Sequence, residues 1–440
     1  MTRRVLALIA AGALTLGALP ARAYVPEKTP DRHLEASIRR TIALPAARTS
    51  FAGLVVMRGG RELFAVHPDH ALRPASLMKL ATTTTAMIRL GPDFRFATRV
   101  LGARSRTGVA KTLWLVGGGD PTLATRAYRH DNFLPKPDDP VPVPVFRSSS
   151  PTIEQLAAAV ARAGVRRISG DLVIDDTLFD AVRTQPGWIP DYLRNNPDTG
   201  YIDALTVNEG RADLKGKTLL TDPAETAGAL LKTALVGRGV MVTGAVHHGS
   251  APAGAPELAR VSSPPLREII SYTNRYSINY DAEILLKGLG ARFGGAGTTV
   301  AGVTVVRTTL ASIGVPLQGF VMRDGSGLSV LDRATPRTLA AILGWMLQAP
   351  GAGGAALRDS IPVAGGPGTL FKRMTKPPTK GNLRGKTGSI RHVRGMAGWV
   401  TPPDGIPLVY VSMFNDVPRP LQLTSALDLI GLALALFGPA

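Results

Sequence analysis

A serine and a lysine stand three positions apart in the apolar stretch RPASLMKL, residues 73–80. If this stretch is helical, Ser76 and Lys79 share one face and the amine can reach the hydroxyl. A serine hydroxyl is a weak nucleophile until a neighbouring group takes its proton. A lysine can take that proton only when it is neutral, a state that burial or a second nearby cation favours. The pair therefore predicts a serine nucleophile with a lysine base.

Two further short motifs follow in the chain. YSIN contains Ser277 and Asn279 just before a stretch of helical character. GKTGS, on a predicted strand, contains Lys386, Thr387, Gly388 and Ser389. About one Ser-x-x-Lys spacing is expected by chance in a chain of this composition, and the other two motifs alone are compatible with a helix cap and a turn. The presence of all three in this order favours the catalytic interpretation.

Taken together, the three motifs resemble the signature of serine acyl-transfer enzymes that react with penicillin. The chain is similar to the penicillin-binding-protein type of D-alanyl-D-alanine carboxypeptidase/endopeptidase, low-molecular-mass class C, with a large insertion after the SxxK motif. The 197 residues between Lys79 and Ser277 agree with such an insertion. One departure is Ile278, because the family often has Asp or Asn there; this puts local hydrogen bonding and rate in question. Besides the motifs, the similar stretches are LVGGGDPTL (115–123), ISGDLVIDDTLFD (168–180), DGSGLS (324–329) and IPVAGGPGTL (361–370).

The resemblance and the chemistry together assign the catalytic roles. Ser76 would attack the carbonyl between two D-alanines, and Lys79 would accept its proton. Ser277, helped by Lys386, would pass a proton toward the leaving amine. Asn279 would hold Lys79 and the amide of the substrate.

The third motif is expected to bind the substrate. Lys386 and Thr387 would grip the terminal carboxylate through charge-assisted hydrogen bonds. Lys386 would also hold down the pKa of the neighbouring lysine, because two ammonium groups in one pocket repel. Gly388 would let its strand approach the substrate closely. The backbone N–H groups of Ser76 and Ser389 are the expected oxyanion hole.

The predicted function is hydrolysis of peptidoglycan stem peptides by an acyl-enzyme mechanism, with penicillin as a slowly released acylating agent. The enzyme would remove terminal D-alanine, cut D-alanyl–diaminopimelate crosslinks, or do both. A β-lactamase or esterase built on the same motifs, and a non-catalytic wall-binding protein that retains the pocket, stay open as alternatives. We predict no cofactor and no metal, since HPDH (67–70) reads as a polar turn and the chain lacks HExxH.

The N-terminal residues predict export. Arg3 and Arg4 precede an apolar segment, and Ala21-Arg22-Ala23 has the form of a cleavage site, so residues 1–23 resemble a signal peptide removed after Ala23. We therefore expect a periplasmic protein. The segment 427–438, LDLIGLALALFG, is too short for a membrane span and reads as a core helix, with peripheral membrane or wall association as the alternative.

Composition narrows the partners and the chemistry. The chain has a formal charge of +19, and without the three arginines of the leader, which contains no acid, it carries about +16. This charge favours polyanionic surroundings, but no nucleic-acid motif or basic-aromatic stripe accompanies it, so nucleic acid is not an expected partner. The absence of cysteine excludes a thiol nucleophile, disulfides and thiolate metal sites.

The elements that must position these residues define the expected fold class, α/β in the α+β sense. A hairpin over 51–67 and three late strands over 383–416 would form one antiparallel sheet covered by helices, as in the serine β-lactamase/transpeptidase fold. Short strand-like runs between Gly-rich turns predict an inserted β-rich region of one or two small domains, with one capped helix at 152–164. The expected division is a leader at 1–23, transpeptidase-like parts at 24–93 and 261–440, and the insertion at 94–260.

Overall fold

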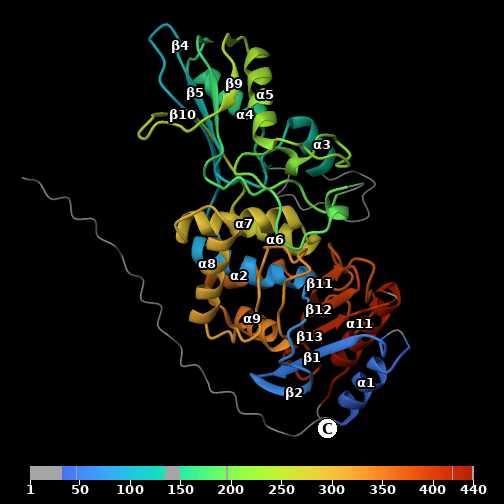
Figure 1. Cartoon of the computed structure of the whole chain (residues 1–440). Coiled ribbons are helices and arrows are strands. Elements are labelled where there is room, and N and C mark those ends of the chain that lie inside the picture. The colour runs from blue at the N-terminus through green and yellow to red at the C-terminus, as the bar shows by residue number, and fades with distance from the viewer. Residues whose placement is uncertain (1–31, 46, 134–148, 195–196, 419, 439–440) are drawn as a thin grey trace, which may run out of the picture.

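The computed structural model describes residues 32–45, 47–133, 149–194, 197–418 and 420–438. The expected leader and most of the proline-rich loop at 134–151 lie outside the described residues. The two parts of the chain that flank the predicted insertion build one sheet with helices on both faces, and the inserted region stands beyond helices α6 and α7 (Figure 1).

The central sheet closes only when the chain returns to it at its C-terminal end. Its strand order is β11-β12-β13-β1-β2, and all its pairs are antiparallel. The first and last parts of the chain meet where β1 pairs with β13, with Phe51 opposite Asn415 and Arg58 opposite Leu408. The predicted hairpin and three late strands are thereby confirmed. Their bounds are β1 (Phe51–Arg58), β2 (Arg61–Val66), β11 (Arg384–Ile390), β12 (Val393–Val400) and β13 (Leu408–Asn415).

Successive residues of the sheet face two separate cores, as the period of a strand requires. Val55 packs in the core beneath α2 (Lys79–Leu90), whereas its neighbours Leu54 and Val56 pack in the core shared with α1 (Arg32–Ile42) and α11 (Pro420–Ala435). The terminal apolar segment belongs to α11, which covers one face of the sheet (Figure 1). It is therefore part of a core helix. Within the described residues, no helix is long and apolar enough to cross a bilayer.

The helical layer is interrupted at the second motif. The segment 264–294 forms two helices that are separated at Ser277 and Ile278. The Gly-rich segment 351–360 forms α10, which we did not predict because glycine disfavours helices in isolation. The helices of this layer beyond α2 are α6 (Leu266–Tyr276), α7 (Asn279–Phe293), α8 (Thr299–Ser312), α9 (Pro336–Gln348) and α10 (Gly351–Ser360).

The inserted region has sheets of its own. A five-stranded mixed sheet has the order β10-β3-β5-β7-β9, and three short strands form a second sheet, β4-β6-β8. The strands of the inserted region are β3 (Ala97–Leu101), β4 (Val109–Ala110), β5 (Leu113–Val116), β6 (Arg167–Ile168), β7 (Leu172–Asp175), β8 (Met241–Val242), β9 (Val246–His248) and β10 (Glu257–Ser262).

Three helices accompany these strands: α3 (Arg126–Phe133), α4 (Ile153–Arg162) and α5 (Pro223–Val236). The capping box of Thr152 and Gln155 that begins α4 is present as predicted. Helix α5 was missed, and its central glycine shows why. A Cβ on Gly228 would lie 2.7 Å from both Ile174 Cδ1 and Val246 Cγ1, so this glycine permits close packing on the sheet although it weakens the helical signal.

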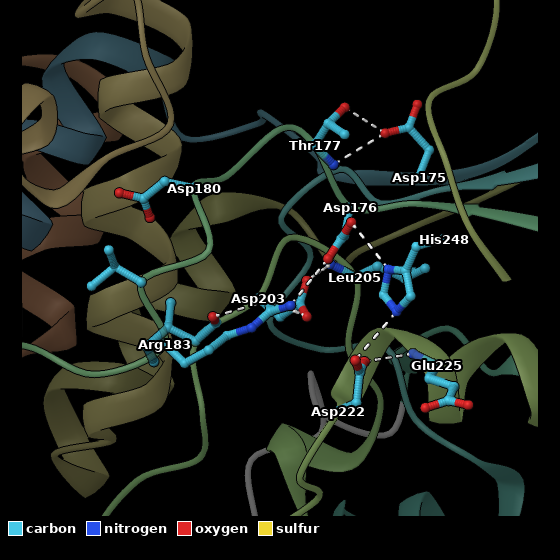
Figure 2. Close-up of polar contacts among 12 residues, drawn as sticks. Asp175, Asp176, Thr177, Asp180, Arg183, Asp203, Leu205, Asp222, Glu225 and His248 are labelled. Carbon is cyan, nitrogen blue, oxygen red and sulfur yellow. Dashed lines mark hydrogen bonds and ion pairs between the residues drawn. The ribbon is translucent and has the colours of Figure 1, made fainter.

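A chain of charged groups crosses the inserted region close to α7 (Figure 2). Asp203 is fully buried, forms an ion pair with Arg183 and accepts a hydrogen bond from Leu205 N at 3.0 Å. Arg183 also contacts Asp176 at 3.1 Å, and His248 lies 3.5 Å from that same carboxylate. Burial raises the pKa of the Asp203 carboxyl to about 7. Arg183 therefore compensates a charge that the interior would otherwise disfavour.

We expect Arg183→Ala to lower the free energy of unfolding by about 3 kcal/mol, because it leaves the Asp203 carboxylate buried without its cation. The loss should be larger at pH 8 than at pH 5, since this carboxyl is protonated and uncharged below its folded pKa of about 7. Urea unfolding monitored by fluorescence measures both values.

The matched control is Arg39→Ala, which removes an exposed i,i+4 pair with Glu35. It should change stability by less than about 1 kcal/mol at either pH. Equal losses of unfolding free energy for the two variants would show that the buried Arg183–Asp203 ion pair contributes no more to stability than an exposed pair.

Candidate active site

Ser76 lies on a short 3₁₀ turn, Ala75–Met78, that runs directly into α2. The stretch is helical as the motif requires, but the α-helix begins only at Lys79. The predicted proximity is nevertheless present, because residues i and i+3 eclipse one another in a 3₁₀ helix. Lys79 Nζ lies 2.9 Å from Ser76 Oγ. Ala75 has a φ of 50°, a left-handed conformation that is unfavourable for alanine and is stabilised only by the packing around it.

The second motif occupies the break between α6 and α7. Ser277 has φ 61° and ψ 39°, and this left-handed residue ends α6. Asn279 begins α7 and its Oδ1 accepts a hydrogen bond from Lys79 Nζ at 2.6 Å. Ile278, the departure from the family pattern, packs in the apolar cluster of Phe179 and Ile202 from the inserted region. It therefore contributes apolar contact between that region and α7.

The third motif lies on β11, at the edge of the central sheet. Lys386 is fully buried, and its Nζ donates to Ser277 Oγ at 2.8 Å and to the Thr387 carbonyl at 2.9 Å. Thr387 is half-buried and Ser389 is exposed. The structure thus brings all three motifs together: Ser76–Lys79–Asn279 and Ser277–Lys386 are two connected sets of contacts.

Gly388 allows β11 to approach the turn that carries the serine. A Cβ at this position would lie 2.8 Å from the Pro74 carbonyl oxygen and 3.0 Å from Leu77 Cγ. A larger residue would therefore push the strand away from the 3₁₀ turn. We expected this glycine to let its strand approach the substrate. In the structure, it lets the strand approach the 3₁₀ turn that carries Ser76.

Burial controls the charge of both lysines. Lys79 is fully buried, and desolvation lowers its pKa from 10.5 to about 7, although four carboxyl groups act in the opposite direction. Burial also lowers the pKa of Lys386 well below its ordinary value, and the nearby Lys79 lowers it further. A substantial fraction of Lys79 is therefore neutral at physiological pH, as a proton acceptor requires.

Three further groups contact the residues of the site or the loop beside them. Only one of them lies in a stretch that the sequence singled out, DGSGLS. The carbonyl of Ser326, in the DGSGLS loop, accepts from Lys79 Nζ at 2.8 Å. The carbonyl of Asp198, from the inserted region, accepts from Asn279 Nδ2 at 2.9 Å. Trp188 Nε1, also from the inserted region, donates to Asp324 at 2.8 Å. In the sequence, the DGSGLS stretch was singled out only by its resemblance to the family. Backbone carbonyls, however, leave no signal in residue type, so their partners could not be predicted.

The other candidate polar residues have structural roles. Asp69 of HPDH forms an ion pair with Arg337, and His67 Nδ1 lies 2.9 Å from the Ala52 carbonyl oxygen. His392 is in the turn after β11 and contacts the Val417 carbonyl. The described residues include no group of three or more His, Cys, Asp or Glu side chains suited to a metal ion.

Relatives of known activity match most of the chain. A D-alanyl-D-alanine carboxypeptidase of Actinomadura sp. (strain R39) is 31% identical and matches 87% of this chain and 81% of the relative. A carboxypeptidase of Mycobacterium tuberculosis is also 31% identical, over 81% of this chain and 74% of that protein.

A solved structure shares the fold. The crystal structure of penicillin-binding protein 4 from Haemophilus influenzae superposes with a TM-score of 0.75 and 19% identity, covering 90% of this chain and 98% of that one. The predicted transpeptidase-like fold with an extra inserted region is therefore confirmed.

The family comparison identifies the class of enzyme. The D-Ala-D-Ala carboxypeptidase 3 (S13) family matches at residues 34–218 and 215–432, which together span nearly all the described residues. With the serine–lysine geometry above, these matches show that the chain belongs to this family, as a serine peptidase of the class C penicillin-binding-protein type.

Proposed function

We propose that this enzyme hydrolyses the D-Ala-D-Ala end of peptidoglycan stem peptides through an acyl-enzyme on Ser76. The proposal rests on two contacts, in which each serine lies against a different buried lysine. Lys79 Nζ lies 2.9 Å from Ser76 Oγ, and Lys386 Nζ lies 2.8 Å from Ser277 Oγ. One pair suits attack on the carbonyl, and the other suits departure of the amine.

In the first step, neutral Lys79 takes the proton of Ser76 Oγ as this oxygen bonds to the carbonyl carbon. The backbone N–H groups of Ser76 and Ser389 would stabilise the negative oxygen of the tetrahedral intermediate. The proton then passes through Ser277 to the leaving nitrogen, and D-alanine departs. Water, deprotonated by the same lysine, attacks the ester and regenerates the serine.

Lys386 and Thr387 are suited to the terminal carboxylate of the substrate. In the described part of the chain, Lys386 Nζ contacts only uncharged oxygens, those of Ser277 and Thr387. A bound carboxylate would supply the missing negative charge and favour the ammonium form. The same geometry suits D-alanyl–diaminopimelate crosslinks, so we propose endopeptidase action as a second reaction of the site.

Relatives support the finer points of this proposal. The Haemophilus influenzae protein has been solved in complex with a β-lactam, and a Bdellovibrio bacteriovorus protein with a TM-score of 0.53 is described as a predatory endopeptidase. We extend β-lactam acylation to Ser76 of this chain. We also propose that the protein is exported to the periplasm and loses residues 1–23.

Penicillin treatment should add one molecule of penicillin to the wild-type protein, on the peptide that contains Ser76. Ser76→Ala should lose this adduct and reduce D-alanine release by at least about 1,000-fold, because the nucleophile is absent. Mass spectrometry of digested protein and an assay of free D-alanine measure the two outcomes.

The remote variant Ser37→Ala, on α1, serves as the control and should label like wild type. An adduct on another residue would contradict the assignment of the nucleophile. Stoichiometric labelling without D-alanine release would favour the wall-binding alternative, and rapid turnover of penicillin would favour the β-lactamase.

The acylation rate should depend on pH through Lys79. Its pKa of about 7 is lowered from 10.5, so the neutral, reactive form predominates above pH 7 and the protonated form below it. We expect the second-order rate constant for penicillin acylation to reach half its plateau near pH 7 and to fall about tenfold per unit below that. Stopped-flow or quenched labelling between pH 5 and 9 measures this profile. A rate independent of pH across this range would exclude a lysine base with a lowered pKa.

Expression of the full chain in a bacterium should yield a periplasmic protein whose first residue is Tyr24. Replacing the small residue of the cleavage motif, Ala21→Arg, should leave the leader attached, because signal cleavage requires small side chains there. The intact mass of the purified protein measures the outcome. A periplasmic protein that retains residues 1–23 in both forms would contradict cleavage.

A further inference from the structure

A buried acid lies behind the catalytic lysine, and the mechanism above does not use it. Glu283 is only 1% exposed and lies one helical turn after Asn279 on α7. Within the described residues, no ion pair of Glu283 is found. A carboxyl group in such a place is costly unless it is hydrogen-bonded or protonated. Its partners therefore indicate why the site contains it.

Glu283 holds the backbone of two consecutive residues. Gly325 N donates to both of its carboxyl oxygens, each at 3.0 Å, and Ser326 N donates to Oε1 at 2.8 Å. The same two residues present their carbonyls to α2. Gly325 O accepts from Thr82 Oγ1 at 2.7 Å, and Ser326 O accepts from Lys79 Nζ at 2.8 Å.

The backbone of Gly325 and Ser326 is thus held from two sides. Glu283 on α7 accepts from the two N–H groups, and Thr82 and Lys79 on α2 donate to the two carbonyls. Space is tight, because a Cβ on Gly325 would lie 2.4 Å from the Ala282 carbonyl oxygen. Rotation of these backbone groups would cost hydrogen bonds on both sides, so the Ser326 carbonyl stays directed at the lysine.

We propose that Glu283 is a positioning residue for the proton acceptor: it fixes the Gly325–Ser326 backbone, and through the Ser326 carbonyl it sets the position of the Lys79 amine. The proposal rests on the role of Lys79 proposed above. It adds a residue outside the three motifs to the machinery that makes a lysine act as a base.

The electrostatics of this region agree with that role. Burial raises the pKa of Glu283 to about 8, so the group is largely uncharged at neutral pH, when Lys79 is also losing its proton. An ionised Glu283 would favour the ammonium form of the lysine and oppose catalysis. The other acids that act on Glu283 or on Lys79 from the surrounding elements are Asp198, Asp281, Asp324 and Asp332.

Three substitutions test whether this anchor positions the lysine. Glu283→Gln keeps an oxygen that can accept from the N–H groups. Thr82→Val loosens the same stretch of backbone from the opposite side. Glu283→Ala removes the anchor. The readouts are penicillin acylation of Ser76 and D-alanine release as functions of pH, with thermal unfolding to establish that each variant is folded.

We expect Glu283→Ala to lower plateau activity by about tenfold to a hundredfold, because the lysine loses its aligned acceptor. Its acid limb should stay near pH 7, because the Glu283 carboxyl is already largely uncharged there. Glu283→Gln should keep most of the plateau activity, because its amide oxygen can still accept hydrogen bonds from the Gly325–Ser326 backbone. Thr82→Val should show reduced activity with an unshifted limb.

The inference is overturned if folded Glu283→Ala keeps the wild-type plateau activity, or if Glu283→Gln is as slow as Glu283→Ala. Labelling of wild-type protein in parallel distinguishes failure of the role of Glu283 from failure of the proposed function. Labelling of wild type at Ser76 with unaltered profiles in the variants contradicts only the role of Glu283. Absence of labelling in wild type contradicts both that role and the proposed function.

Discussion

The site depends on the burial of two amines next to each other. Lys79 and Lys386 are both fully buried, and each donates hydrogen bonds to uncharged oxygens, which reduces the cost of its burial. Without those acceptors, two desolvated ammonium groups at this distance would be strongly unfavourable. Desolvation is also what gives the lysine its basic form, so the feature that costs stability is the one that enables the chemistry.

This constraint explains how the fold is built around the site. The acceptors for the two lysines come from α7, the DGSGLS loop and the break after α6, while the lysines themselves belong to α2 and β11. β11 reaches its place only through the sheet, whose closing pair joins β1 to β13 at opposite ends of the sequence. The glycine at 388 then sets how near the strand can come to the 3₁₀ turn of Ser76. The geometry of the site therefore depends on the stability of the sheet.

The inserted region contributes residues that contact the active site. Tyr192 packs with Ala75, beside the nucleophile, and with Ile390 and Val393 at the end of the third motif. Trp188 and Asp198 reach the DGSGLS loop and Asn279 by hydrogen bonds. Ile278 then fills an apolar cluster between the inserted region and α7. A residue that departs from the family pattern thus matches its apolar surroundings.

The sequence alone determined which residues carry the chemistry and in which order their motifs occur. Ser76, Lys79, Ser277, Asn279 and Lys386 were identifiable because short motifs encode local spacing. The strands of the sheet were identifiable because a two-residue period is also local. Helices α5 and α10 were missed because their glycines weaken local helical propensity, and in α5 the glycine permits close packing on the sheet.

Only the tertiary structure decided which groups stand behind the motifs. The Ser326 and Asp198 carbonyls and the Glu283 carboxyl carry no recognisable spacing, since their partners lie between 42 and 247 residues away in sequence. The lowered pKa of Lys79 likewise follows from burial by several distant elements at once. A pKa shift caused by desolvation arises only when the folded chain buries the group. No local stretch of sequence can therefore predict it.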